Sequence, residues 1–454
     1  AGEACRATTT RAAERAVKEA FFSLARRLAA SLGADEVLLC NLSPERSDFV
    51  RFNQARVRQA GSVEQRYLSV RLVRRRRHAS ATLSLGGGGD DLASAREALA
   101  GLRDSLDSLP EDPWLLYNDA PRSTETVRRG RLAPAEGLVD EVLLQAKSKD
   151  LVGIYAAGTS FRGFANSLGQ RNWHEADSFN LDWSLYQEAD RAVKASYAGF
   201  VWQPGEFASR MESAAEQLAR LAIPRREIRP GEYRAFLAPR ALEEVMGLLG
   251  WGGFSARARQ TRQSPLLRMQ EGETLSPAVT VAENTAEGIA HGFQADGFIK
   301  PARVELIRQG RLGDPLISPR SAKEYGLATN AANADEAPGS LEMLGGGLDE
   351  DRILRELGCG LYISNLWYLN FSDRPAGRIT GMTRFATLWV EDGRIAAPAS
   401  PLRFDDSIYR LLGERLVALT QRREFLLDPS TYGARSSASA RLPGALVSAM
   451  RFTL

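Results

Sequence analysis

The sequence has few cysteines and no long apolar run. Its 454 residues include three cysteines, Cys5, Cys40 and Cys359, and none is close to another along the chain. This spacing excludes a disulfide framework and a zinc knuckle, and it favours a reducing compartment, for which we expect the cytoplasm. No apolar stretch approaches the roughly 20 residues that a membrane span needs, so we expect no membrane partner.

The chain also lacks a strong charge of either sign. The formal net charge is +3, and the hydrophobic and charged contents of 44% and 25% are those of an ordinary globular protein. The run "RLVRRRRHAS" at 71–80 is basic, but the segments on both sides alternate like strands and no nucleic-acid-binding module accompanies it. We therefore place these arginines on a solvated strand face or at a subunit contact, and expect no nucleic-acid partner.

The apolar pattern predicts an α+β protein of two or three domains, because 454 residues are too many for one core. An N-terminal α/β domain is expected first, then a central domain with helices and an antiparallel β-meander. A C-terminal, irregular, mostly-β domain follows, where glycine and proline are frequent. The predicted domains are 1–110, 111–225 and 226–454, and the strands predicted in the first are 36–43, 48–61, 65–77 and 78–85.

Residues 360–398 predict two strands joined by a charged connection, then a tight turn and a third strand. Asp392-Gly393 is a strong signal for a two-residue hairpin turn. The segment "SDRPAGRITG" at 372–381 is longer than the usual hairpin loop of about two to five residues. Because long connections between strands often line a site, we expect a loop at a cavity or subunit surface here.

The order of the segments resembles the TldD/PmbA (TldE) family of metalloprotease-associated proteins over nearly the whole chain. The segment "RVELIRQGRLGDPLISPRSAKEYGLATN" is similar to a strand, turn, strand and helix of that family. The segment "GLYISNL…ITG…FATLWVEDGRIAAP" is similar to its closing strands, with a Thr-Gly turn at Thr380. Further similar segments are "NQARVRQAGSVEQRYLSVRLV" and "RPGEYRAFLAPRALEEVMGLL".

The resemblance implies a zinc site in some family members. Their helix carries His-Glu-x-x-x-His, and a cysteine near the segment corresponding to 360–398 completes the site. Two histidines on one helix face can bind one ion, and the glutamate can act as a base on bound water. The corresponding helix here, "RALEEVMGLLGWGG", has no histidine, and its adjacent Glu243 and Glu244 point in different directions. Because Cys359 precedes the strand and "NLWYLNF" at 365–371 has no cysteine, we predict no metal in this chain.

Other catalytic motifs are not evident. His78 flanks the arginine run, where a solvated strand residue is expected, and His174 is placed in a turn of the meander. His291, in the glycine-rich "GIAHGFQADGF", is the best histidine candidate for the family's cleft, with a packed or hydrogen-bonded loop histidine as the alternative. No serine lies in G-x-S-x-G, and the glycine runs at 86–89 and 345–347 lack the lysine of a phosphate loop. We predict no catalytic residue.

Binding is the remaining role. A strand edge can take up an extended peptide, and Trp367, Tyr368 and Trp389 could line apolar pockets, with core packing as the alternative. Arg374 and Arg378 could meet a carboxylate of a peptide or a partner, with a solvated turn as the alternative. Thr380 and His291 complete the candidate set of peptide-binding or interface residues.

The resemblance implies a non-catalytic, TldE/PmbA-like subunit of a heterodimeric zinc metallopeptidase. A TldD-like partner subunit would carry the zinc, and the pair would degrade or process small or unfolded peptides. Two alternatives stay open: a stand-alone peptide-binding or scaffold protein that forms a homodimer, and a hydrolase with a divergent mechanism.

Overall fold

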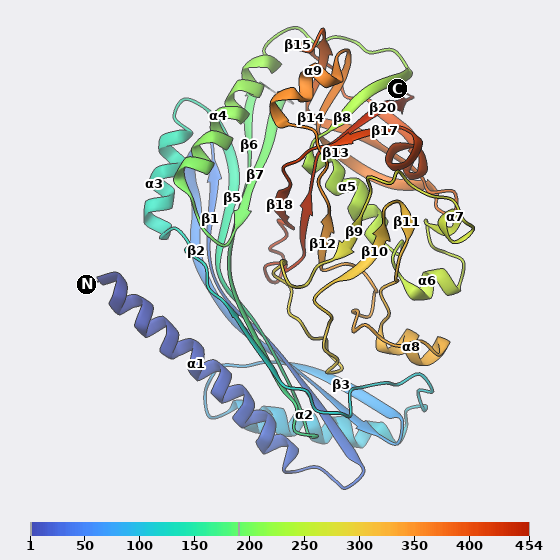
Figure 1. The fold of residues 1–454 in the computed structure, drawn as a ribbon. Helices are drawn as coiled ribbons and strands as arrows, with labels where there is room; N and C mark the ends of the chain where they lie inside the picture. Colours follow the sequence, from blue (N-terminus) through green and yellow to red (C-terminus); the bar gives the residue numbers. More distant parts are fainter. Residues whose placement is uncertain (1, 189–190, 454) are drawn as a thin grey trace.

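The computed structural model describes residues 2–188 and 191–453, which fold into three β-sheets with helices packed on them. Figure 1 shows a long, curved sheet from the N-terminal part of the chain along one side of the molecule, and the C-terminal half against its concave side. The predicted α+β class is confirmed. Within the described ranges, no helix combines the length and the apolar character that crossing a membrane requires.

The first sheet joins the first two predicted domains. Its strands lie in the order β3-β2-β1-β5-β6-β4, with β7 on β6. β1 pairs with β5 along most of its length, from Leu39 opposite Asn166 to Phe52 opposite Gly153, so the boundary predicted at residue 110 falls between strands of one sheet. The strands are β1 (Glu36–Asn53), β2 (Arg56–Arg74), β3 (Arg77–Ser84), β4 (Thr124–Arg128), β5 (Asp150–Asn166), β6 (Arg171–Glu188) and β7 (Arg191–Gly199).

The turns of this sheet differ from those predicted. The predicted strand 48–61 is two strands, because Gln54 and Ala55 both have a φ of 51° and form a tight turn between β1 and β2. The arginine run forms the next turn, since Arg75 and Arg76 have φ values of 50° and 69°. Paired positive φ values match the twist of a two-residue hairpin, but these four residues lack the usual Asn-Gly or Asp-Gly signal.

Helices cover this sheet in two places. Near one end, α1 (Gly2–Ala29) and α2 (Asp91–Leu106) share a core with the sheet that includes Phe21 and Trp173. Near the other end, α3 (Ala135–Gln145) and α4 (Pro204–Leu221) share a second core that includes Trp183 and Phe207. Helices therefore pack near both ends of the sheet, and the remaining surface of the sheet is free to meet the C-terminal half (Figure 1).

The C-terminal half contains the other two sheets. One has the order β11-β10-β9-β12-β19-β18 and the other β13-β8-β20-β16-β14-β15, with β17 on β20 and β13 also paired with β14. Their strands are β8 (Gly231–Leu237), β9 (Val281–Glu283), β10 (Val304–Arg308), β11 (Arg311–Leu312), β12 (Ser340–Met343), β13 (Gly360–Asp373), β14 (Arg378–Glu391), β15 (Arg394–Pro398), β16 (Arg403–Ser407), β17 (Leu416–Leu419), β18 (Glu424–Leu427), β19 (Ser439–Leu442) and β20 (Ala445–Phe452). The helical segments are α5 (Pro239–Gly250), α6 (Ala256–Gln260), α7 (Leu267–Gln270), α8 (Pro319–Tyr325), η1 (Glu350–Arg352), α9 (Ile353–Leu357) and η2 (Arg410–Glu414).

The β13–β14 hairpin corrects one prediction and confirms another. The expected ten-residue loop at 372–381 is a connection of four residues, 374–377, because β13 continues to Asp373 and pairs there with Arg378. Thr380 therefore lies in β14, opposite Asn370, and does not form a turn. The turn predicted at Asp392-Gly393 is confirmed: both residues have positive φ, and β15 follows directly.

Candidate functional site

Helix α5 forms one wall of a large cavity in the C-terminal half. Pro239 occupies its first turn, where a missing backbone N–H costs nothing. One face of α5, including Leu242, Val245 and Leu249, is buried in the core of the C-terminal half. The chain leaves the helix at Trp251 and turns at Gly252, whose φ is +87°. The opposite face of α5 is thereby held in a fixed position on the cavity wall.

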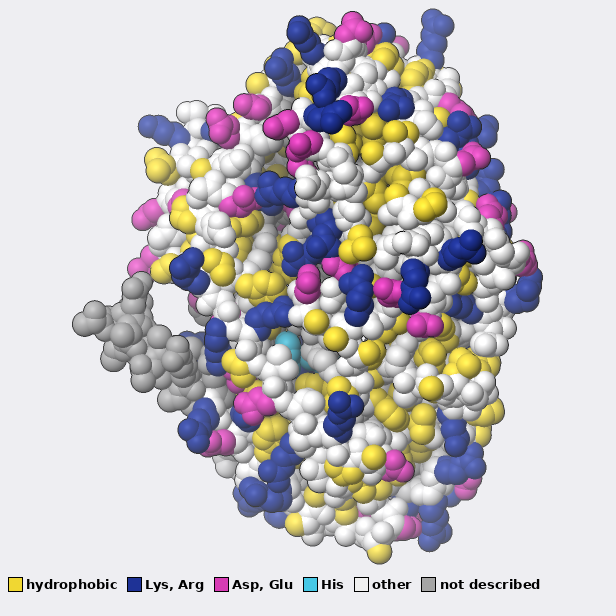
Figure 2. Space-filling view, viewed as in Figure 1, with side chains coloured by type: hydrophobic (Ala, Val, Ile, Leu, Met, Phe, Trp, Pro, Cys, Tyr) yellow, Lys and Arg dark blue, Asp and Glu magenta, His cyan; other side chains and the backbone are white. Residues whose placement is uncertain are grey.

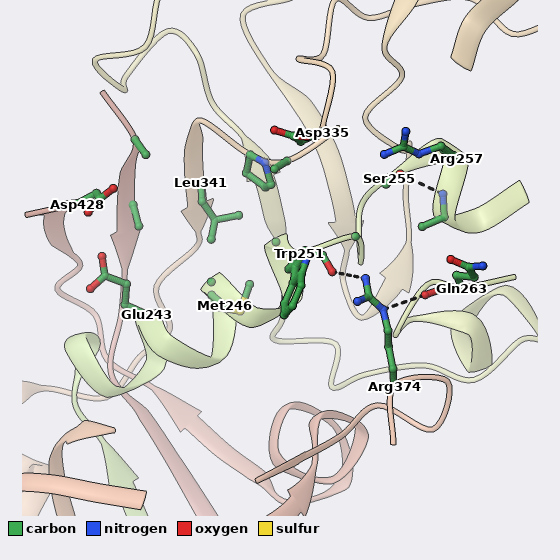
Figure 3. Close-up of a pocket in the computed structure, with 18 of the residues that line it drawn as sticks. Glu243, Met246, Trp251, Ser255, Arg257, Gln263, Asp335, Leu341, Arg374 and Asp428 are labelled. Atoms are coloured by element: carbon green, nitrogen blue, oxygen red, sulfur yellow. Dashed lines mark hydrogen bonds between the residues drawn. The ribbon is translucent and has the colours of Figure 1, made fainter. Parts of the chain in front are cut away.

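The cavity has a volume of about 890 Å³ and lies between α5, the ends of β12 and β19, and the tip of the β13–β14 hairpin. Met246 and Leu341 provide apolar surface, while Glu243 and Asp428 bring carboxylates. In Figure 3 these two acidic residues lie at one end, and Trp251 with Arg374 lies towards the other. An apolar wall with carboxylates at one end and a guanidinium at the other suits an extended peptide segment better than a uniformly charged ligand.

Arg374 fastens the hairpin tip to the end of α5. Its Nη2 donates to the Trp251 carbonyl at 2.6 Å and its Nε donates to the Gln263 carbonyl at 3.1 Å. The guanidinium carbon also lies 5.5 Å from the centre of the Trp251 ring. Arg374 is among the residues that line the cavity, and its two hydrogen bonds hold the hairpin tip against the end of α5.

The acidic end of α5 is already paired with a cation. Arg240 hydrogen-bonds to Glu243, and its Nη2 lies 3.5 Å from a carboxylate oxygen of Asp182 on β6. Its Nε donates to the Ser196 hydroxyl on β7 at 3.1 Å. Burial raises the pKa of Glu243, although the Arg240 charge opposes that rise. Arg240 therefore connects α5 to the first sheet. It also forms an ion pair with the carboxylate of Glu243, which faces the cavity.

A second buried carboxylate, Glu336, holds the far wall in place. It accepts hydrogen bonds from the Ser255 hydroxyl, the Arg257 amide and both the amide and the hydroxyl of Ser318, at 2.5 to 2.9 Å. Burial alone would raise its pKa, but these hydrogen bonds outweigh it and hold the pKa below the ordinary value. Ser255 and Arg257 line the cavity, so Glu336 positions this wall without lining it.

The other arginine and threonine of the hairpin point elsewhere. Arg378 forms an ion pair with Asp405, and its side chain is 46% exposed. The Thr380 hydroxyl donates to the Phe404 carbonyl at 2.9 Å. Neither residue lines the cavity described above.

The three aromatic candidates divide into two groups. Trp389 is 6% exposed, and its indole N–H donates to Glu391 at 2.9 Å, so it packs in the core, which was the alternative. Trp367 and Tyr368 are 50% and 78% exposed, and the Arg384 guanidinium lies 4.6 Å from the centre of the Trp367 ring. These two lie on the surface, outside the cavity wall.

Of the three histidines, His174 lies elsewhere than predicted, whereas His78 lies in a strand and His291 in a loop, as expected. His174 is inside β6 and buried, because the turn before it is at 167–170 and not around His174 itself. His291, in the loop between β9 and β10, lies beside it, with 6.4 Å between the ring centres. His78 is partly buried and contacts Asp112, with 3.2 Å between its Nε2 and the carboxylate. The pairing of His174 with His291 could not be read from residues so far apart in sequence.

The C-terminal half is matched by a family model. Residues 230–454, which hold α5 and the cavity, match the model described as the PmbA/TldA metallopeptidase C-terminal domain. The chain belongs to the TldD/PmbA family through this domain. The resemblance found in the sequence is confirmed. A comparison with curated proteins finds none of comparable sequence.

Solved structures share the fold over nearly the whole chain. A candidate modulator of DNA gyrase from Thermotoga maritima matches with a TM-score of 0.76 at 17% identity, covering 95% of this chain and 100% of its own. TldE from Thermococcus kodakarensis matches with a TM-score of 0.76 at 14% identity, covering 96% and 100%. A candidate modulator of DNA gyrase from Bacteroides thetaiotaomicron gives 0.73 at 16% identity, covering 95% and 98%. At such identities the likeness establishes the fold.

Proposed function

We propose that this TldD/PmbA-family chain is a metal-free, non-catalytic subunit that pairs with a zinc-bearing, TldD-like subunit. The pair hydrolyses small or unfolded peptides, and this chain contributes part of the peptide-binding surface. The observation that carries the proposal is the make-up of α5, the cavity-lining helix: it has no histidine, and Arg240 holds its cavity-facing Glu243.

The side chains around α5 do not fit zinc. In the ranges that the structure describes, no group of three or more histidine, cysteine, aspartate or glutamate side chains is arranged to hold a metal ion. Cys359 is exposed and lies just before β13, away from the lining of the cavity. A zinc ion needs several converging deprotonated donors, so we derive no catalytic step through zinc in this chain.

The cavity supports the peptide part of the proposal. Its wall combines apolar side chains with separate acidic and basic groups, which matches a ligand that has apolar side chains and a charged group at each end. TldE from Thermococcus kodakarensis has the same fold, which is consistent with the proposed subunit type.

The first test compares the chain alone with the assembled pair. The purified chain is expected to hold no stoichiometric zinc by elemental analysis and to leave peptides uncut. Addition of the TldD-like subunit is expected to produce chelator-sensitive cleavage, together with a heterodimer by size measurement. Tightly bound zinc in the lone chain, or cleavage by it that a chelator does not stop, would overturn the proposal.

A cavity-filling variant tests the role of the pocket. Gly247 lies on the cavity face of α5, and a Cβ atom added there meets no atom within 4 Å, so the first carbon of a leucine side chain fits and the rest extends from the helix at the cavity wall. Gly101→Leu, on the exposed side of α2 and equally free of contacts, is the matched control. Both variants should gain up to about 1 kcal/mol of stability, because glycine is a poor helix former, but only Gly247→Leu should lower peptide turnover by the pair. Equal turnover in both variants would exclude the cavity from peptide binding.

A further inference from the structure

Basic side chains gather between the two halves of the molecule, outside the α5 cavity. Arg162 on β5 lies directly opposite His174 on β6, and opposed residues of antiparallel strands project their side chains on the same face as neighbours. The loop between β9 and β10 covers this place with His291, whose ring centre is 6.4 Å from that of His174. Lys300, towards the end of the same loop, donates its backbone N–H to the carbonyl of Gly292, the residue after His291, at 2.9 Å, and its charge acts on both histidines.

The positive charges of this cluster have little compensation. The Arg162 guanidinium donates a hydrogen bond to the Phe161 carbonyl at 2.9 Å. The acidic residue whose charge attracts the Arg162 guanidinium is Glu45. Lys300 is influenced by Glu283, but that carboxylate already accepts hydrogen bonds from the Gly339 and Ser340 amides. In the described part of the chain, neither Arg162 nor Lys300 forms an ion pair.

His174 has an unused hydrogen-bonding group. The residue is 7% exposed, and its Nε2 lies 3.2 Å from the Ile289 carbonyl, which requires a proton on that nitrogen. Its Nδ1 is buried and has no hydrogen-bond partner. A buried nitrogen without a partner is costly, and a second proton would make it a donor. Burial and the nearby cations lower the pKa of His174 to about 4, so the protein in its present state keeps this ring neutral.

We propose that His291 and Lys300, backed by Arg162 and His174, form a binding site for an oxyanion. The ligand is a carboxylate or a small inorganic oxyanion, because either would supply the negative charge that the cluster lacks and accept hydrogen bonds from its donors. His291 and Lys300 both keep part of their surface in contact with solvent. Figure 2 shows a histidine side chain at the surface between the two halves, with Lys and Arg side chains around it.

An anion in this site favours protonated histidines. The charged side chains that act most strongly on the two histidines are cationic, while Glu45 and Glu283 act on Arg162 and Lys300. A bound oxyanion therefore raises the pKa of His174 and His291, and binding is tighter at lower pH. The groups concerned are Arg128 on β4, Arg162 on β5, Glu45 on β1, Glu283 on β9, and Lys300 and His291 in the loop.

The three histidines of the chain allow a direct test by NMR. The full chain, labelled at histidine, is titrated with sodium sulfate, whose charge is constant between pH 5 and 8, and separately with an acetylated tripeptide acid and its amide. Saturable shifts of the His174 and His291 signals are expected, with His78 unmoved. Sulfate identifies an inorganic source of the oxyanion, and shifts by the peptide acid but not by the amide identify a carboxylate source.

Lys300→Met is expected to weaken binding by about tenfold or more, since a hydrogen bond to a charged group is lost. Lys323→Met, on the exposed side of α8, is the matched control and should bind as the parent does. If neither sulfate nor the peptide acid moves the two histidine signals of the unmodified protein, the site does not exist. Shifts that Lys300→Met leaves intact would also overturn the assignment. The assay uses this chain alone, so its result is independent of whether the proposed pair cleaves peptides.

Discussion

Replacing Arg240 by methionine tests whether α5 depends on its ion pair. The change keeps much of the apolar stem of the side chain but leaves the carboxylate of Glu243 without its partner and removes one contact of Asp182. The side chains of Arg240, Glu243 and Asp182 are 16%, 23% and 14% exposed, so they are largely shielded from solvent. Removing one partner of a buried pair costs about 3–5 kcal/mol. Because Asp182 keeps Lys194 at 3.3 Å, we expect about 3 kcal/mol at pH 7.

The cost should depend on pH in a defined direction. The folded-state pKa of Glu243 is raised by burial, and Arg240 is the group that opposes the rise. Without Arg240 that pKa rises further, which destabilises the folded protein at every pH above the ordinary value of 4.5. Below that value Glu243 is protonated in both the folded and the unfolded chain, so the deficit shrinks as the pH falls from 7 towards 4.

Urea unfolding of the parent, Arg240→Met and the double variant Arg240→Met/Glu243→Leu measures this cost. The double variant should recover most of the lost free energy, because two apolar side chains in place of a buried pair are often neutral. A deficit for Arg240→Met that is the same at pH 4.5 and pH 7 would refute the electrostatic reasoning. A double variant as unstable as the single one would show that packing around Arg240 matters more than its charge.

Three further predictions concern single side chains. Arg374→Met should cost about 1–2 kcal/mol of unfolding free energy, because two hydrogen bonds to carbonyls are lost. Arg378→Met should cost less than about 1 kcal/mol, because its ion pair is half-exposed. Equal costs of the two variants in urea unfolding would contradict this order. Gly288→Ala places a methyl group 2.0 Å from a serine hydroxyl and should cost about 2 kcal/mol or more by the same assay, while Gly292→Ala, with nothing within 4 Å, should stay within about 0.5 kcal/mol. Glu336→Gln should cost about 2 kcal/mol of unfolding free energy at pH 7. Hydrogen bonds lower the pKa of the Glu336 carboxylate, so the stability that it provides is present above its ordinary pKa and is lost as the pH falls. Thermal melts in which the variant shows the same deficit from pH 7 down to pH 3 would argue against that role.

Local sequence patterns predict much of the secondary structure and part of the site. The apolar spacing of α5 and the Asp392-Gly393 turn are set by neighbouring residues, and both agree with the structure. Arg374 lines a cavity, but it is not carried there by a long loop. A long loop was expected around Arg374, whereas the strands on both sides pair almost to the tip.

The features that the sequence did not predict correctly depend on contacts between distant segments. The β13–β14 connection looked long because residues 372–381 include two arginines, an aspartate and a proline, but charged residues are common on the solvent side of a hairpin. His174 was misplaced because the preceding turn was set too late by a few residues. Its contact with His291 arises when a loop of the C-terminal half packs on the first sheet, and no local pattern contains that information.

The shared first sheet has a consequence for the synthesis of the protein. β1 is complete when residue 53 has left the ribosome, yet its partner β5 ends at Asn166. At about 5–20 residues per second, translating the intervening stretch takes on the order of ten seconds. Throughout that time one edge of a long strand has unpaired amide and carbonyl groups, and such an edge can pair with any other extended chain. The nascent protein is thus most open to misassembly before its central region exists, and translation speed between β1 and β5 sets how long that exposure lasts.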